Sequence, residues 1–105
     1  MIMYARLVEG KFKPGKYDFA TQTLEKEVIP LLRKQPGFRD EISFFNQDLG
    51  RGYAISFWEN KADLERYERE VYPKVRDKMA EAFVELPMAK DYEVANSTWY
   101  RIHAA

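Results

Sequence analysis

Residues 35–58 constrain the fold of this 105-residue chain more than any other stretch. They open with Gln35-Pro36-Gly37, which is a helix-stopping signal, and continue as two extended runs, residues 38–47 and 53–58. A break of turn-forming residues, Asp48-Leu49-Gly50-Arg51-Gly52, separates the two runs. The pattern predicts a β-hairpin. Apolar side chains occur on both of its faces, so both faces need a covering layer.

The chain before the hairpin supplies a strand and a helix. Residues 3–12 alternate loosely between apolar and polar side chains and are expected to form the first strand. Apolar side chains between residues 17 and 34 recur at helical spacing, which predicts an amphipathic helix. Pro30 lies inside this helix and is expected to kink it or to thin its last turn, because proline lacks a backbone donor.

The chain after the hairpin repeats the pattern. Asn60 is a good N-cap for a second helical region that Pro73 interrupts and that ends near Leu86. Residues 92–103 regain extended character and are expected to form the last strand. The order of elements predicts an α+β, ferredoxin-like split βαβ fold with a four-stranded antiparallel sheet, in a single domain over residues 1–105.

The faces of the sheet predict association. In residues 38–47 the even positions Phe38, Ile42 and Phe44 are expected to meet the helices, and Phe45 lies on the other face. Two helices cover one face of such a sheet, so the second face would expose an aromatic patch. We therefore expect a two-fold symmetric homodimer that packs sheet to sheet.

Polar side chains on the second face are expected to serve this dimer. Glu41 and Ser43 are interpreted as hydrogen-bonding groups of the interface, and Arg6 as a partner of Glu41 across it. Neither Glu41 nor Ser43 is assigned a role as a general base.

Composition removes several classes of function. Lys plus Arg and Asp plus Glu both number 17, so no net charge attracts nucleic acid or an anionic membrane. The chain has no cysteine and one histidine, which argues against a metal site. No bound cofactor, metal, nucleic acid or membrane is expected. Nothing in the chain is apolar enough to span a bilayer, and we expect a cytoplasmic location.

Several short motifs resemble the dimeric α/β-barrel superfamily, in particular its antibiotic-biosynthesis-monooxygenase-like branch. They are Pro36-Gly37-Phe38, the turn at Gly50, and residues 57–64 followed by Tyr67. The resemblance implies a ferredoxin-like subunit whose sheet pairs with that of a second copy to close a barrel. It also implies a ligand cleft between sheet and helices. Activities in the superfamily include cofactor-independent oxygenation of polyketide quinols, quinol oxidation and haem degradation.

Haem degradation finds no matching residues. The haem-degrading enzymes that resemble this chain use an asparagine on the first strand, a tryptophan on the second helix and a histidine further on. Here residues 3–12 contain no asparagine, and the other two positions are Tyr67 and Asp77.

Three residues are candidates for catalysis. Tyr67 packs over the sheet in the simplest interpretation, but its hydroxyl could also bind a substrate oxygen. His103 is a solvated strand end in the simplest interpretation. Together with Arg101, on the same face of the expected last strand, His103 could instead hold a phenolate or an oxygen-derived anion.

Three further residues are candidates for substrate binding. They are Trp58, which otherwise is a core residue, Tyr72, at the expected helix break before Pro73, and Phe44. A break in a helix frees backbone groups and opens space, which is why Tyr72 is included.

Two main hypotheses of function remain open, beside a third, a role as a subunit of an assembly through the exposed faces. The first is a cofactor-independent monooxygenase or quinol oxidase that acts on an aromatic or polyketide-like molecule in a dry pocket. The second is a dimeric small-ligand-binding or stress-associated barrel without catalysis. The sequence does not decide whether the protein is an enzyme.

Overall fold

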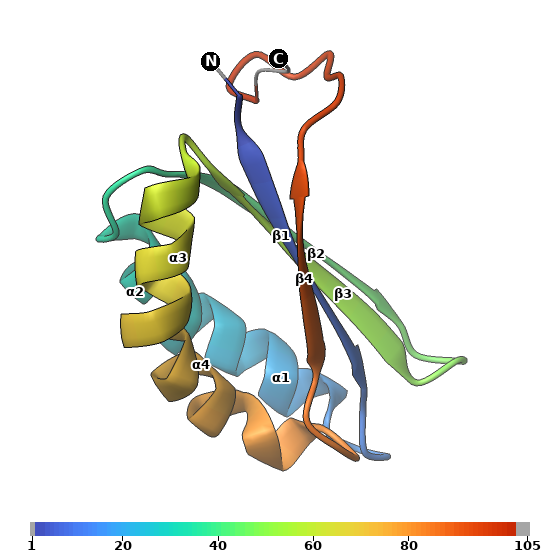
Figure 1. Ribbon diagram of the computed structural model, residues 1–105. Coiled ribbons are helices and arrows are strands. Elements are labelled where there is room, and N and C mark those ends of the chain that lie inside the picture. Colours follow the sequence, from blue (N-terminus) through green and yellow to red (C-terminus); the bar gives the residue numbers. More distant parts are fainter. Residues whose placement is uncertain (1, 103–105) are drawn as a thin grey trace.

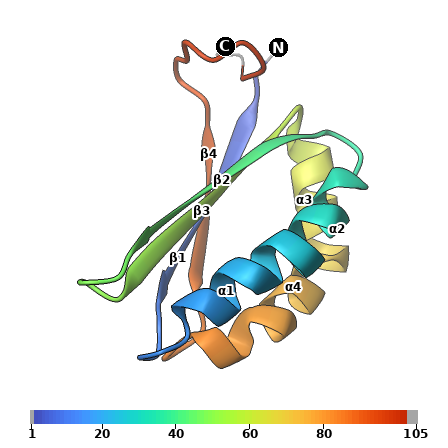
Figure 2. The same cartoon turned by 180° about the vertical axis from the view of Figure 1, so that it is seen from behind.

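The computed structural model describes residues 2–102 and shows a four-stranded antiparallel sheet with helices packed on one face (Figure 1). The strands are β1 (Tyr4–Lys11), β2 (Phe38–Asn46), β3 (Arg51–Trp58) and β4 (Met88–Glu93), in the spatial order β2-β3-β1-β4. The view from behind shows the helices as one layer against this sheet (Figure 2). The predicted α+β, ferredoxin-like fold is confirmed.

The first helical segment contains an irregularity close to the predicted one. It runs from α1 (Tyr17–Thr23) through a π-helical stretch, η1 (Leu24–Val28), into α2 (Ile29–Arg33). The π-helical stretch comes shortly before Pro30, whose ring crowds the preceding turn and which cannot donate to a carbonyl there. Gly37 follows the helix with a φ of 78°, a left-handed conformation that glycine adopts without strain.

The second helical segment is broken where the sequence predicts it. Asn60 caps α3 (Lys61–Glu70), with its side chain accepting from the Asp63 backbone N–H at 2.8 Å. The chain bends at Val71, and α4 (Tyr72–Met79) begins with Pro73 in its first turn. A short 3-10 turn, η2 (Ala80–Ala82), follows, so the helical region ends earlier than the expected Leu86.

A β-bulge in β2 reverses the predicted faces of this strand. The pairing of β2 with β3 shifts between Phe38 and Asp40, so one extra residue is inserted there. Phe38 packs against the helix side, and beyond the bulge Glu41 and Phe45 also face the helices. Our assignment of Ile42 and Phe44 to the helix side and of Phe45 to the outer side was therefore wrong. The interface roles of Glu41 and Ser43 depended on that assignment and are withdrawn.

The last strand is also corrected. It comprises Met88–Glu93, not residues 92–103, and pairs only with β1. It is an edge strand with exposed polar side chains, so its sequence lacks the alternation of apolar and polar residues by which a strand is predicted. Trp99, expected within it, lies in the segment that follows and contacts the Phe57 ring edge to face at 5.5 Å.

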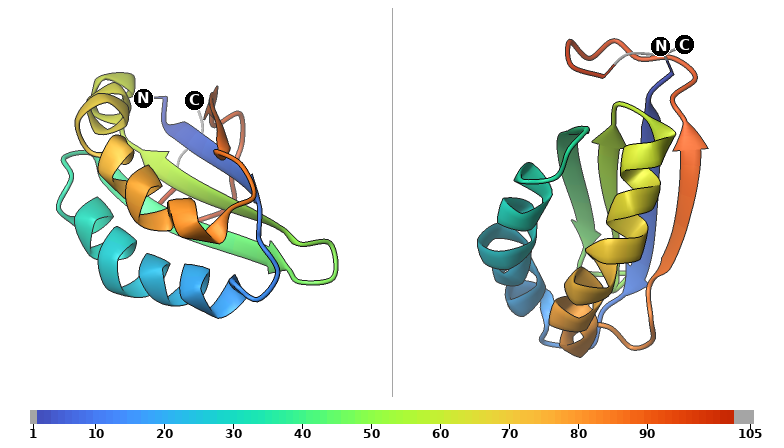
Figure 3. Two further views of the ribbon diagram at one scale, coloured as in Figure 1. Left: turned by 90° about the horizontal axis from the view of Figure 1, so that it is seen from below. Right: turned by 60° about the vertical axis from the view of Figure 1, so that its left-hand side comes forward.

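Two apolar clusters lie on opposite faces of the sheet. The larger lies between the sheet and the helices and includes Trp58, Leu64 and Tyr67. The smaller lies on the other face and consists of Met3, Phe57, Val94 and Ile102. Figure 3 shows the helices stacked on one side of the sheet, with the segment after β4 near one end of the strands. Within residues 2–102 no helix has the length and apolarity needed to cross a membrane.

Candidate functional site

A cavity of about 80 Å³ lies between the sheet and the helices. Its walls are mostly apolar and come from β1, β2 and β3 below and from η1, α2, α3 and α4 above. A pair of facing glycines, Gly10 on β1 and Gly52 on β3, contributes to the floor. A side chain at Gly52 would collide with the rings of Phe12 and Phe45, which pack there edge to face. The glycines therefore make room for the aromatic end of the cavity.

The polar side chains of the site form one row across the sheet. Glu41 on β2 pairs in register with Ser56 on β3, Ser56 with Arg6 on β1, and Arg6 with Asp91 on β4. Glu41, Ser56 and Arg6 all line the cavity. We call these four residues the polar row. A charged row on the buried face of a sheet is unusual, because burial of a charge is costly unless it is paired.

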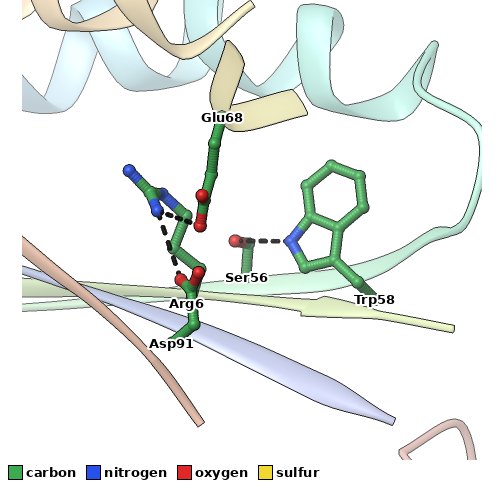
Figure 4. Close-up of polar contacts among 5 residues, drawn as sticks. All are labelled: Arg6, Ser56, Trp58, Glu68 and Asp91. Carbon is green, nitrogen blue, oxygen red and sulfur yellow. Dashed lines mark hydrogen bonds and ion pairs between the residues drawn. The ribbon is translucent and has the colours of Figure 1, made fainter. Parts of the chain in front are cut away.

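Arg6 is held in place by two carboxyl groups. Its Nη1 donates to Glu68 Oε1 at 2.6 Å and to Asp91 Oδ1 at 3.2 Å (Figure 4). The Arg6 guanidinium carbon lies 4.3 Å from the centre of the Tyr72 ring, a cation–π contact. The residue is 7% exposed, and its Nε is buried without a hydrogen-bond partner within the described part of the chain.

The two carboxyl groups affect each other. Burial, followed by the hydrogen bond with Asp91, raises the pKa of Glu68 to about 7, against the lowering effect of Arg6. Two carboxyl groups that share one guanidinium disfavour a second negative charge. Near neutral pH the Glu68 carboxyl is therefore partly protonated.

Glu41 is the second acidic group of the site. Burial raises the pKa of its carboxyl, and the hydroxyl of Ser43, which donates to Oε2, lowers it by a smaller amount. Glu41 and Arg6 thus place an acid and a cation on the cavity floor, on either side of the small Ser56.

Tyr67 and Tyr72 come from the helix side. Tyr67 is 4% exposed, and its pKa is raised above the ordinary value, mainly by burial; Arg6 lowers it, and Tyr72 and Glu41 raise it. Its hydroxyl therefore stays protonated and can donate a hydrogen bond at any ordinary pH. Both tyrosines line the cavity.

Other predicted site residues lie elsewhere. Trp58 is fully buried beside the cavity, with its ring 4.9 Å from the Tyr67 ring at an interplanar angle of 31°. It donates its indole N–H to the Ser56 hydroxyl at 2.9 Å (Figure 4). Phe44 is 50% exposed on the outer face of the sheet. Arg101 binds Asp40 and the Arg39 carbonyl at the edge of β2, and it does not line the cavity. His103 lies outside the described residues.

The overall arrangement was compared with solved structures. A monooxygenase from Streptomyces coelicolor, in complex with the ligand nanaomycin D, superposes with a TM-score of 0.75 over 93% of this chain and 92% of its own, at 14% identity. A structure described as an antibiotic biosynthesis monooxygenase gives 0.65 over 85% and 95%, at 16% identity. The chain has the fold of the antibiotic biosynthesis monooxygenases.

This monooxygenase fold also occurs in proteins without a known activity. A protein of unknown function from Nitrosomonas europaea superposes with a TM-score of 0.77 over 94% of this chain and 95% of its own, at 15% identity. Comparison of the sequence with models of known families and with curated proteins gives no match. The likeness to these structures therefore concerns the fold alone.

Sequence analysis missed Arg6 and Glu41 as site residues. Arg6 gave one available signal: it is the one cation on the strand face that also carries Tyr4, Val8 and Phe12. Glu41 gave none, because its face depends on the bulge.

Proposed function

We propose that the protein binds a small aromatic molecule in the cavity and oxidises it with molecular oxygen, without a bound metal or flavin. The observation that carries this proposal is the cavity itself, which combines apolar walls with Arg6, Glu41 and the hydroxyl of Tyr67. Ligand sites are mostly apolar with a few placed polar groups. The nanaomycin D complex of a protein with the same fold gives further support.

The chemistry needs little from the protein. An anthrone, an aromatic ketone whose CH₂ group lies across the central ring from the carbonyl and is made acidic by it, loses one proton to give an anion. The anion passes one electron to O₂, the resulting radical and superoxide combine into a peroxide anion that takes the proton back to become a hydroperoxide, and loss of water leaves a second carbonyl. In sum, CH₂ and O₂ become C=O and H₂O. The protein contributes a dry pocket and donors to the developing oxyanion, which is the role we assign to Tyr67, with Tyr72 beside it.

Oxygen consumption with a panel of anthrones and quinols tests the proposal. Replacing Tyr67 by Phe removes a hydroxyl from the cavity, and the rate is expected to fall by roughly 10- to 100-fold. Tyr100→Phe is the matched control, because Tyr100 is 93% exposed. Should Tyr67→Phe consume oxygen as fast as the parent, Tyr67 has no part in catalysis. If no panel member supports consumption above the uncatalysed rate, the oxidase function fails.

The second candidate is a ligand-binding protein without catalysis. The cavity of about 80 Å³ is small beside the roughly 300 Å³ at the lower end of ordinary ligand pockets, which favours a small ligand over a fused-ring substrate such as an anthrone. Binding of panel members without oxygen consumption would support this alternative.

The outer face of the sheet supports a homodimer. Phe44, Tyr53 and Tyr92 are 50%, 38% and 50% exposed there, on three different strands. Exposed aromatic side chains on three strands of one sheet face are uncommon on a monomer. We infer that a second copy covers it, as the sequence predicts, although by different side chains of β2 than expected.

A further inference from the structure

We propose that the polar row selects a flat aromatic ligand with an oxygen acceptor at one end and a hydroxyl at the other, Arg6 binding the acceptor and Glu41 the hydroxyl. The inference rests on the proposed use of the cavity as a ligand site. It requires no oxidation step.

The spacing of the row fits such a ligand. Arg6 and Glu41 are both register partners of Ser56, so they lie on the two strands that flank β3. Adjacent strands are about 4.8 Å apart, which places the two backbones about 10 Å from each other. Ser56 between them is small, and it already accepts the indole N–H of Trp58. An aromatic ring with oxygens at opposite positions can therefore lie above Ser56 and reach both side chains.

The Arg6 end has an unused donor. Both ion pairs of Arg6 use Nη1, so that within the described part of the chain Nη2 has no hydrogen bond and Nε is buried without a partner. Side chains at such buried positions normally satisfy their donors, so a ligand oxygen would complete the hydrogen bonding of this guanidinium.

The Glu41 end has an acceptor. Ser43 donates to Oε2 of Glu41, which leaves Oε1 for a ligand hydroxyl. A buried carboxyl that receives few hydrogen bonds gains from a further donor, and loses when a methyl ether takes the place of the hydroxyl. Above this end and the Arg6 end, the Tyr67 and Tyr72 rings add flat apolar surface, which favours an aromatic ligand.

Three redox-stable probes test each end separately: 4-hydroxybenzoate, 4-methoxybenzoate, which lacks the hydroxyl donor, and phenol, which lacks the carboxylate. Calorimetry with the full chain is expected to show that the parent binds 4-hydroxybenzoate about tenfold or more tightly than either other probe. Arg6→Met should lose the preference over phenol and keep the preference over 4-methoxybenzoate. Glu41→Met should keep the preference over phenol and lose the preference over 4-methoxybenzoate.

Matched controls separate recognition from folding. Arg51→Met removes an arginine whose ion pair with Glu9 also joins β3 to β1 but lies in solvent, and it should keep both preferences. Since Arg6→Met leaves Glu68 and Asp91 without their cation, it is also tested together with Glu68→Gln.

The outcomes are distinct from those of the oxygen assay. Equal affinity of the parent for all three probes, absence of binding by any of them, or variants that keep both preferences would overturn the proposal. Selective binding without oxygen consumption would support the polar row and reject the oxidase function. Oxygen consumption without selective binding would support the oxidase function and reject the proposed role of the polar row.

Discussion

Arg6 Nη1 lies 2.6 Å from Glu68 Oε1, so a single ion pair ties the first strand of the sheet to α3. The side chains are 8% and 29% exposed. Asp91 on the edge strand binds the same nitrogen at 3.2 Å, which adds β4 to the connection. The position of α3 over the cavity thus depends on a charge cluster and not on apolar packing alone.

The charge cluster makes stability depend on pH. The pKa of Glu68 is raised from 4.5 to about 7 by burial and by Asp91, so between these values the folded protein binds more protons than the unfolded chain. The stability that protonation of Glu68 contributes to the folded protein is fully present below pH 4.5 and is lost as the pH rises through 7. From about pH 5.5 to about pH 8, we expect the parent to lose about 1 to 2 kcal/mol of unfolding free energy relative to Glu68→Gln.

Urea unfolding at both pH values measures this difference. Glu65→Gln is the control, because Glu65 lies on the exposed side of the same helix and pairs only weakly with Lys61 at 3.9 Å. A parent and a Glu68→Gln variant with parallel pH profiles would contradict the raised pKa.

Ser56→Ala tests the support of the buried tryptophan. The Ser56 hydroxyl accepts the indole N–H of the fully buried Trp58 at 2.9 Å, and its loss leaves that donor unsatisfied. We expect a cost of about 1 to 3 kcal/mol in urea unfolding. Ser97→Ala, which removes an exposed hydroxyl bonded to the Trp99 backbone, should cost much less. Equal costs would mean that water replaces Ser56.

Phe44→Asp tests the homodimer. The Phe44 ring is 50% exposed on the outer face, and a carboxylate there would be buried without a partner between two sheets. We expect the parent to sediment as a dimer at micromolar concentration and the variant as a folded monomer. Leu86→Asp, at a residue that is 65% exposed outside the sheet, should stay dimeric. A monomeric parent would refute the association.

Asn60→Ala tests the start of α3. Asn60 accepts the backbone N–H of Asp63 at 2.8 Å, and its loss should cost about 1 kcal/mol. Thermal unfolding followed by circular dichroism measures it, with the exposed Asn96→Ala as the control. If both variants melt together with the parent, the cap contributes nothing to stability.

The sequence predicted elements where local chemistry determines them. Asn60 as a cap, Gly37 as a turn and Pro73 as a break act through their own backbone preferences, and all three lie where expected. It could not show the bulge near Arg39, because one inserted residue leaves the alternation on either side intact while exchanging the faces.

The same limit applies to the site. Asp91 belongs to an edge strand that is defined by its pairing with β1 and not by its own side chains. Its meeting with Arg6 and Glu68 joins three elements that are distant in sequence, and no spacing along the chain records such a contact.

Gly10 and Gly52 face each other on neighbouring strands, and the rings of Phe12, Phe45 and Phe83 occupy the space that side chains there would fill. Because Gly10 and Gly52 have no side chains, these rings can pack there, and they set how far the cavity extends toward the hairpin. Small changes at these rings, such as Phe83→Leu, would lengthen the cavity without touching the polar row. The fold can in this way accommodate longer ring systems while it keeps the same recognition of their oxygen atoms.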